Sequence, residues 1–401
     1  MMKIAVSWST SADSVRAAEE AYHSLMEKLA DKPSIILAHG SCLYDSAAQI
    51  RRLAELAPDT PLHGGTSCLG VMTEQGFHTR DGYGLGLLGL FDPQGHYGAG
   101  LAELGADPAG AARRALEAAL AQAGRPGETP AAILVSSAPG HEEAIIKTLE
   151  EHVGTGVPII GGSTADNDMS GQWRQFANGE VAAAGVSVAV LFSSGEIGFS
   201  FHSGYEPTTK KGRATRTSGR ILHEIDGQPA AQVYNRWTEG LIAGVLPTGG
   251  SLVPTATFTP LGNPVGEVRG VPYYRLSYPV EALPDGSLVL FTEVRPDSEL
   301  VLMRGTPENL VTRTGRAAAA ALDMAPFGAE DVQGALVLFC TGCMLAIQDQ
   351  MDIPRASLAG TLQGAPFLCA FTLGEQGCFL GGENRHGNLM VVVLVFGPPP
   401  R

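Results

Sequence analysis

The chain has 401 residues, enough for two or three domains of ordinary size, and 44% of them are hydrophobic, so a large core is available. Its formal net charge of -14 argues against a nucleic-acid-binding surface. No segment reaches the roughly 20 consecutive apolar residues of a membrane-spanning helix, so no membrane insertion is expected.

The N-terminus and the cysteines both favour a cytoplasmic protein. A predicted strand at residues 3–8 opens the chain directly, so we expect no signal peptide. The six cysteines are spread through a large acidic chain, which favours reduced thiols over a disulfide framework.

Two similar stretches follow one another in the N-terminal part of the chain. In each, a strand leads through a polar turn and a helix to Pro-x-x-Gly-Gly and a run of hydroxyl side chains, and a second extended run follows. Helices are also predicted at 11–30, where Ser11 or Asp13 is the expected N-cap, and at 108–123. The first stretch covers about 34–100, with strand 34–38, helix 43–57 and extended run 82–91; the second has strand 132–135, helix 142–153 and extended run 181–192.

The remainder contains a third, looser copy of this pattern. Residues 244–264 are rich in Gly, Pro and Thr and are predicted to form a loop. Before the copy, we expect short strands at 273–279, 287–292 and 299–303 and a helix at 307–322. The strands of the copy itself are expected at 335–339, 366–372 and 388–396. We predict an α/β fold of repeated strand-loop-helix-strand units, forming mixed sheets covered by helices in two pseudo-repeated halves, with domains at 1–240 and 241–401.

The Gly-Gly turns predict a ligand pocket. Glycine lets a backbone approach a ligand closely, and open α/β sheets bind ligands beyond the carboxyl ends of their strands. The alternative is a tight turn in which the hydroxyls and carboxylate only cap the next element. The predicted ligand-binding residues are Gly64, Gly65, Thr66 and Ser67 on one wall, Gly161, Gly162, Ser163, Thr164, Asp166 and Asn167 on the other, and Cys340 and Glu375 from the third copy.

Several motifs together resemble the FIST sensory domain over nearly the whole chain. They are Val157 to Asp166, then 176–180, His202-Ser-Gly-Tyr-Glu-Pro207, Leu222 to Ala230, Phe339-Cys-Thr-Gly-Cys343, and 384–396. The resemblance implies a bacterial or archaeal small-ligand sensor, with amino acids as suggested ligands. It also implies a signalling partner, and one branch resembles haem-binding nitric oxide sensors that act on histidine kinases.

This sequence departs from the family pattern at three places. Gly-Gly-Ser-Thr-Ala-Asp replaces Gly-Gly-Ser-Ala-Gly-Asp, and Tyr205 replaces a tryptophan with Ser203 inserted before the glycine. Cys343 stands where the family has an arginine, which disfavours an anionic ligand at that position. Since the sequence shows no transducer domain, we expect any signal to pass to a separate partner.

Cysteine and histidine chemistry supplies further hypotheses. Cys340-x-x-Cys343 at a strand-to-helix junction is typical of redox or metal sites. The further candidate metal ligands are Cys369, Cys378, His386 and Glu375. In the alternative interpretation, the two cysteines are small apolar residues in a packed corner. His202 is the candidate haem ligand, and its alternative is a hydrogen-bonded core histidine.

An enzyme acting on a small metabolite is the contrasting hypothesis. Ser136, Ser137 or Ser163 would be the nucleophile, His141 or His202 the base, and Asp166 the group that orients it. None of these serines lies in a Gly-x-Ser-x-Gly turn. The sequence therefore favours a FIST-type protein that binds a small polar molecule, with haem-based sensing and enzymatic turnover as alternatives.

Overall fold

Three copies of one strand-and-helix arrangement build most of the molecule. The computed structural model describes residues 2–268, 271–379 and 382–400. Each copy, here called a unit, has four strands in the spatial order first, fourth, second, third. The second and third strands are parallel, and the fourth is antiparallel to the first and the second.

Units 1 and 2 have the same order of elements: strand, helix, strand, helix, strand, hairpin, strand. Unit 1 contains β1 (Lys3–Ser9), α1 (Ser14–Leu29), β2 (Ile35–Gly40), α2 (Ser46–Leu56), β3 (Leu62–Thr66), the hairpin β4 (Val71–Thr73) and β5 (Gly76–His78), and β6 (Leu85–Phe91). Unit 2 contains β7 (His96–Glu103), α3 (Pro108–Gln122), β8 (Ala132–Ser137), α4 (Glu142–Val153), β9 (Ile159–Ser163), the hairpin β10 (Gln175–Ala177) and β11 (Glu180–Ala182), and β12 (Gly185–Phe192).

Unit 3 has the same order, with a separate β domain inserted after its first strand. It contains β13 (Ile197–His202), α6 (Pro307–Met324), η2 (Ala329–Asp331), β23 (Gly334–Cys340), α7 (Thr341–Ala346), η3 (Gln348–Gln350), α8 (Asp352–Thr361), β24 (Phe367–Thr372), the hairpin β25 (Glu375–Phe379) and β26 (Glu383–Gly387), and β27 (Val391–Phe396). The looser third copy expected from the sequence is therefore a complete unit.

The hairpins are exchanged between the units in a cycle. The hairpin of unit 1 pairs with β24 of unit 3, the hairpin of unit 3 pairs with β9 of unit 2, and the hairpin of unit 2 pairs with β3 of unit 1. In register, Val71 lies opposite Ala370, Glu375 opposite Gly162, and Phe176 opposite Gly64. Each six-stranded sheet is thus completed by another unit.

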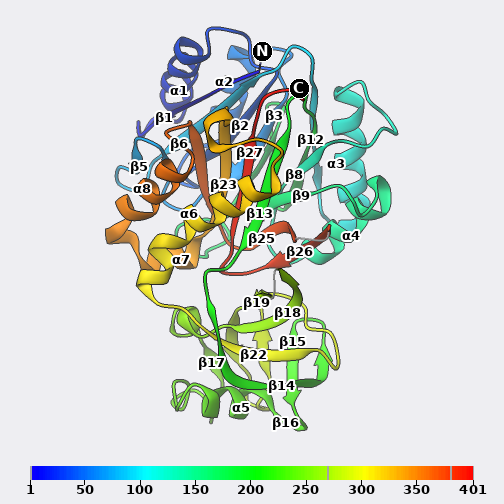
Figure 1. Ribbon diagram of the computed structural model, residues 1–401, viewed down its shortest axis with the longest axis vertical. Helices are drawn as coiled ribbons and strands as arrows, with labels where there is room; N and C mark the ends of the chain where they lie inside the picture. The colour runs from blue at the N-terminus through cyan, green and yellow to red at the C-terminus, as the bar shows by residue number, and fades with distance from the viewer. Residues whose placement is uncertain (1, 269–270, 380–381, 401) are drawn as a thin grey trace.

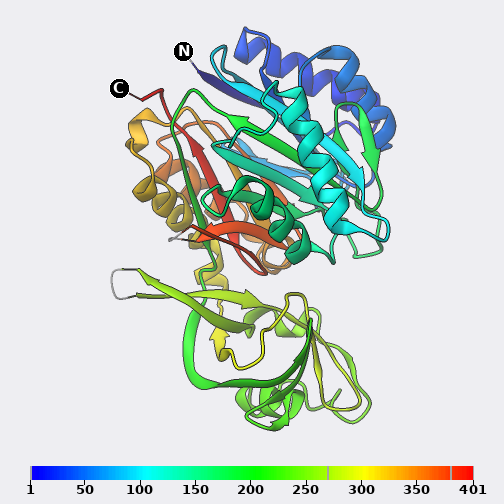
Figure 2. The same cartoon turned by 90° about the vertical axis from the view of Figure 1, so that its right-hand side faces the viewer.

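Alternating side chains place the core on both faces of these sheets. In β2, Ile35 and Leu37 join the central core between the sheets, whereas Ile36 packs under α1 and α2. In β8, Leu134 faces the central core and Ile133 packs under α3 and α4. Figure 2 shows these helices on the outside of the sheets. The predicted mixed sheets covered by helices are confirmed.

Local signals in the sequence set the helix starts. Asp13 caps α1 by accepting from the backbone N–H of Arg16 at 2.8 Å, so Asp13 rather than Ser11 is the N-cap. Thr306 caps α6 by accepting from the N–H of Asn309 at 3.2 Å. None of the helices in the described ranges has the length and apolar composition that crossing a membrane would require.

The inserted segment folds as a small β domain at one end of the molecule, away from both termini (Figure 1). Its nine-stranded sheet takes strands from both sides of residue 240, so the division at 240/241 stays a prediction. The N-terminal half of the chain holds units 1 and 2, and the C-terminal half holds unit 3. The domain contains β14 (Glu206–Ser218), β15 (Ile221–Ile225), β16 (Gln228–Pro229), α5 (Ala230–Trp237), β17 (Gly250–Ser251), η1 (Thr255–Phe258), β18 (Leu261–Val268), β19 (Val271–Ser277), β20 (Pro279–Ala282), β21 (Leu288–Leu290) and β22 (Glu299–Arg304).

A glycine on β7 permits the close packing of α3, and this can be tested. A Cβ at Gly98 would lie 2.0 Å from the carbonyl oxygen of Ala119, so Gly98→Ala must push the helix away from the sheet. We expect the free energy of unfolding to fall by about 2 kcal/mol in urea titrations. Gly156→Ala is the matched control, because no atom lies within 4 Å of its Cβ position. Equal effects of the two substitutions would contradict this packing.

Candidate functional site

A cavity of about 580 Å³ lies where the small β domain meets the units. Its walls come from the loop after β9, from η1 and the strands of the small β domain, and from the junction of β23 with α7. The lining side chains are mostly apolar. The lining residues are Asp166, Asn167, Asp168, Met169, Val253, Pro254, Thr257, Phe258, Tyr278, Phe291, Cys340, Thr341, Gly342, Leu345, Ala346, Leu373, Asn388 and Leu389.

Two polar side chains in the lining of this cavity have an atom without a hydrogen-bond partner among the described residues. Thr341 is buried, and its Oγ1 atom has no hydrogen-bond partner within the described ranges. A buried hydroxyl without a partner costs free energy unless something else binds it. Asn388 also lines the cavity, and its Oδ1 atom accepts from the backbone N–H of Tyr278 at 3.1 Å. The Nδ2 atom of Asn388 has no partner among the described residues, so Thr341 and Asn388 are the polar groups that could bind a molecule in the cavity.

Asp166 and Asn167 line the cavity, but their oxygen atoms hold loops together. The Asp166 carboxylate accepts from the N–H groups of Met169, Gly171 and Gln172 at 2.7 to 2.8 Å. Asn167 accepts from the N–H of Leu69 at 2.8 Å and so ties units 1 and 2 together. Their predicted role as ligand contacts remains a prediction, and the observed role is to shape the cavity wall.

The Gly-Gly pairs lie inside strands, away from the cavity lining. A Cβ at Gly65 would lie 2.2 Å from Thr164, and one at Gly162 would lie 2.5 Å from Thr372. These glycines let the sheets of different units come together. The remaining predicted residues of these walls are also buried in or beside β3 and β9. They are Gly64, Thr66, Ser67, Gly161, Ser163 and Thr164. Ligand contact by any of them stays a prediction.

Behind Cys340 lies a fully buried arginine that the sequence analysis missed. Arg313 on α6 donates to the carbonyl oxygens of Ser203 at 3.0 Å and Leu389 at 2.8 Å, and its guanidinium stacks 4.4 Å from the ring centre of Phe339. Its Nε and Nη2 atoms have no hydrogen-bond partner among the residues described. A sequence signal existed, because Arg313 follows Leu310 by three and precedes Ala317 by four on the apolar stripe of α6.

Four acidic groups act on this guanidinium, those of Tyr205, Cys340, Cys343 and Glu375. Burial would raise the pKa of the Cys343 thiol, but the hydrogen bond with Cys340, the charge of Arg313 and the hydroxyl of Tyr205 lower it to about 6. The Tyr205 hydroxyl lies 3.5 Å from the Cys343 Sγ atom. Burial raises the pKa of Glu375 well above its usual value, although Glu375 accepts from Met390 N–H at 3.0 Å and from Thr372 Oγ1 at 2.9 Å. The groups around Arg313 thus shift in opposite directions, because the pKa of Cys343 is lowered and that of Glu375 is raised.

His202, the candidate haem ligand, does not line the cavity. Its ring packs edge-on against Tyr273, with 6.0 Å between ring centres, and burial together with the charges of Arg316 and Arg313 lowers its pKa to about 4. The hollow beside its strand, lined by Phe201 and Tyr273, holds only about 20 Å³. These surroundings do not fit a haem, and we derive no role for one.

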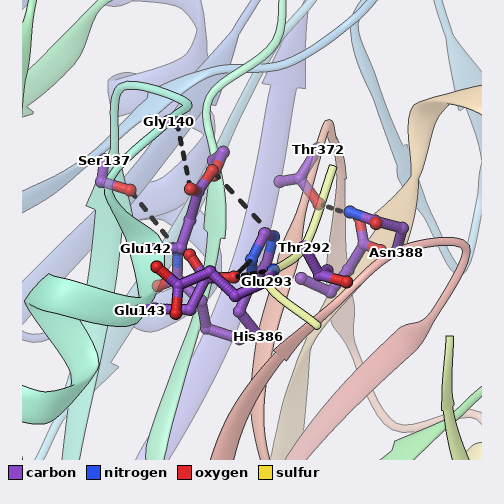
Figure 3. Close-up of polar contacts among 12 residues, drawn as sticks. Ser137, Gly140, Glu142, Glu143, Thr292, Glu293, Thr372, His386 and Asn388 are labelled. Atoms are coloured by element: carbon purple, nitrogen blue, oxygen red, sulfur yellow. Dashed lines mark hydrogen bonds and ion pairs between the residues drawn. The ribbon is translucent and has the colours of Figure 1, made fainter. Parts of the chain in front are cut away.

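A second charged cluster joins α4 to the small β domain (Figure 3). Glu142 and Glu143 face His386, which lies 3.0 Å from Glu143 through Nδ1 and 4.0 Å from Glu142 through Nε2. Arg220 donates to both carboxylates at 2.6 and 2.5 Å. These two glutamates and the histidine are the one group in the described part of the chain whose ligand atoms lie close enough for a metal ion. Arg220 already supplies the positive charge there, and the cysteines do not assemble a metal site with the predicted ligands.

The serine-based catalytic arrangement predicted from the sequence is not assembled. Ser163 donates to Glu142 at 2.5 Å rather than to His141 or His202. Asp166, the expected orienting acid, is bound to backbone N–H groups as described above. Ser136 lies 3.4 Å from the Nε2 atom of His63. None of the hydrogen bonds in the described ranges joins Ser136, Ser137 or Ser163 to His141 or His202, so the predicted pairing of nucleophile and base stays a prediction.

Replacing Arg220 tests whether the charged cluster stabilises the fold, because the effect on the free energy of unfolding should depend on pH. Burial would raise the pKa values of Glu142 and Glu143, but His386 and Arg220 hold both below the usual 4.5. Their charged forms therefore stabilise the fold above that pH, and this contribution is lost as the pH falls. Arg220→Met removes the arginine from two largely buried carboxylates that keep only His386 as a charged partner, and should lower the free energy of unfolding by about 3 kcal/mol at pH 7.

This loss should shrink when the unfolding titration is repeated at pH 4, because protonation removes the unpaired charges. Arg216→Met is the control, since its ion pair with Glu224 is largely exposed and contributes about 0.5 kcal/mol. A loss for Arg220→Met that is equally large at both pH values would contradict the electrostatic explanation.

Comparison with known proteins assigns the chain to a family. A protein of Methanocaldococcus jannaschii without an assigned function is 35% identical over 78 residues, which is 20% of this chain and 15% of that protein. Two crystal structures of cyanuric acid hydrolase, one of them from A. caulinodans, superpose over 99 to 100% of this chain and 100% of theirs, with 9 to 10% identity and TM-scores of 0.35 and 0.32. Likenesses this loose carry no argument about the chain. The family model of the FIST N domain matches residues 34–228 and that of the FIST C domain matches 230–378, so this chain belongs to the FIST family.

Proposed function

We propose that this protein is a sensor that binds a small molecule in the 580 Å³ cavity. The observation that carries the proposal is that the cavity is bounded by both FIST domains. Asp166 to Met169 come from the FIST N domain, whereas Val253 to Phe258 and Cys340 to Ala346 come from the FIST C domain. A molecule bound there would contact both domains and favour one relative position of them.

The lining indicates the chemical class of the ligand. Its volume is in the usual range for small-molecule sites, and its walls are mostly aliphatic and aromatic. The hydroxyl of Thr341 offers one hydrogen bond, and the carboxylate of Asp168 stands at the wall formed by the loop after β9. An apolar body with a polar head fits this lining, which narrows the small polar molecule expected from the sequence. Amino acids with apolar side chains combine these features.

The position of the cavity between the small β domain and the units also suggests how ligand binding could be passed on to a signalling partner. The small β domain contacts the units around the cavity, so ligand binding would alter the surface at this joint. A separate signalling protein, such as a histidine kinase, would read that change in a bacterial cytoplasm. The net charge of -14 makes a nucleic-acid partner unsuitable.

Filling the cavity tests whether it is the ligand site. Leu345 lines the cavity with 43% of its surface exposed, and Ile353 on α8 is 45% exposed and is not part of the lining. Leu345→Trp should abolish the increase in melting temperature given by L-leucine, L-phenylalanine or another apolar amino acid, whereas Ile353→Trp should preserve it. If none of these probes raises the melting temperature of the unsubstituted protein, or if both variants respond alike, the proposal is wrong.

Thr341→Val tests the polar contact separately. Because Thr341 Oγ1 has no partner among the described residues, replacing it with a methyl group removes no internal hydrogen bond. The free energy of unfolding without ligand should change by less than about 0.5 kcal/mol. The same amino-acid probe should bind roughly threefold to tenfold more weakly in titration calorimetry, as expected for one hydrogen bond. An unchanged affinity would remove Thr341 from the site.

A further inference from the structure

Two cysteines meet at the edge of the cavity. Cys340 ends β23 and lines the cavity, and Cys343 lies behind it, fully buried, in the first turn of α7. The two thiols interact strongly enough to move their pKa values in opposite directions, raising that of Cys340 and lowering that of Cys343. Residues three apart at a helix start have Cβ atoms about 5 Å apart, close to the separation that a disulfide spans. Because a disulfide needs Cβ atoms about 4 Å apart, closure would also draw the first turn of α7 slightly toward the end of β23.

The surroundings of the pair favour ionisation of one thiol. The guanidinium of Arg313 is always charged and is fully buried, and none of the described residues forms a carboxylate ion pair with it. A buried cation without an anion is strongly unfavourable. A thiolate at Cys343 would supply that anion, and the Tyr205 hydroxyl lies 3.5 Å from its sulfur. A thiolate beside a second thiol is the arrangement from which disulfides form.

We propose that Cys340 and Cys343 form a redox-active dithiol that closes to a disulfide when a hydroperoxide enters the cavity. The inference depends on the cavity as a route of access and is independent of whether the cavity binds the sensory ligand. The apolar lining favours an organic hydroperoxide as the oxidant. Cys340 is the thiol that the oxidant meets, and Cys343 completes the disulfide.

The reaction balances with these two residues and the hydroperoxide. The proton shared by the pair moves from Cys340 to Cys343, and the Cys340 thiolate attacks the outer peroxide oxygen. The O–O bond breaks, the departing alkoxide takes the proton from Cys343, and Cys340 becomes a sulfenic acid. The Cys343 thiolate then attacks the Cys340 sulfur, and hydroxide leaves and becomes water by taking up a proton. The two sulfur atoms lose two electrons, and the peroxide gains them.

Closure of the disulfide would change the buried charges. It removes the thiolate that balances Arg313, and Glu375 is the other acid facing that guanidinium. The described groups that face Arg313 are Tyr205, Cys340, Cys343 and Glu375. With the thiolate gone, the charge of Arg313 favours ionisation of Glu375, which releases the proton that the departing hydroxide needs. Glu375 accepts a hydrogen bond from Met390 N–H next to the cavity residue Leu389, so oxidation alters the cavity wall.

Oxidation of the full-length reduced protein tests the proposal. After treatment with one equivalent of cumene hydroperoxide, free thiols are alkylated and peptides are identified by mass. We expect a Cys340–Cys343 disulfide in the unsubstituted protein and in Cys378→Ser, which removes a buried cysteine elsewhere. Cys343→Ser should accumulate a sulfenic acid at Cys340 that dimedone traps. Absence of the disulfide, or pairing of Cys340 with another cysteine, would overturn the proposal.

The role of the buried charge has its own measurement. Arg313→Met should slow disulfide formation at least about tenfold at pH 7 and much less at pH 9, where thiols ionise without help. Arg313→Lys, which keeps the charge, should restore most of the rate at pH 7. Tyr205→Phe serves as a milder variant if Arg313→Met fails to fold, and it should slow closure at pH 7 only. Rates that fall equally at both pH values would show a merely structural role and contradict the thiolate assignment.

The two proposals fail independently. Amino-acid binding is measured on the reduced protein with the Leu345→Trp and Ile353→Trp variants. Its presence or absence does not depend on whether Cys340 and Cys343 form a disulfide. Disulfide formation is measured without any amino acid. A dithiol that oxidises in a protein that binds no amino acid would refute only the proposed sensory ligand.

Discussion

The exchange of hairpins between the three units is the constraint on which this structure depends. Without it, β3, β9 and β24 would each leave a row of unpaired backbone groups at a sheet edge. Each edge is covered by a hairpin that follows the third strand of another unit. No unit can complete its sheet alone, so the three units fold as one body although each repeats the same order of elements. The small β domain enters this cycle between β13 and α6 without interrupting the pairing.

The same exchange explains the glycines that dominate the sequence motifs. At β9, Gly162 pairs with Glu375 of the incoming hairpin and lies against Thr372 of unit 3. At β3, Gly64 pairs with Phe176 and Gly65 lies against Thr164. The Pro-x-x-Gly-Gly pattern therefore marks the places where two units meet within one sheet. A ligand pocket and a close contact between sheets require the same residue, because both need a backbone without a Cβ.

Much of the fold could be predicted from the sequence because its signals are local. Strand and helix periodicity, the caps Asp13 and Thr306, and the recurrence of the pattern each depend on residues close together in the chain. The exchanged hairpins could not be predicted, since strands of three residues such as β4 carry almost no periodicity and their partners lie far away in the sequence. For the site, Asp166, Asn167 and Cys340 do line the cavity. The sequence analysis missed Thr341 and the cavity wall that the small β domain forms. Only the insertion of that domain between β13 and α6 brings this wall next to Thr341.

Arg313 shows why charge was the hardest property to predict. An arginine on a helix is normally interpreted as a solvent-exposed residue, and its place on the apolar stripe of α6 was the one sequence signal for its burial against β13 and β27. Once buried, it determines the ionisation of its neighbours, because the guanidinium cannot lose its proton. Cys343 stands where the family resemblance leads one to expect an arginine. The position therefore holds a thiol instead of a positive charge, and the nearby charge of Arg313 favours ionisation of that thiol. The chemistry of the Cys340–Cys343 pair thus depends on one residue of α6 that no motif contains.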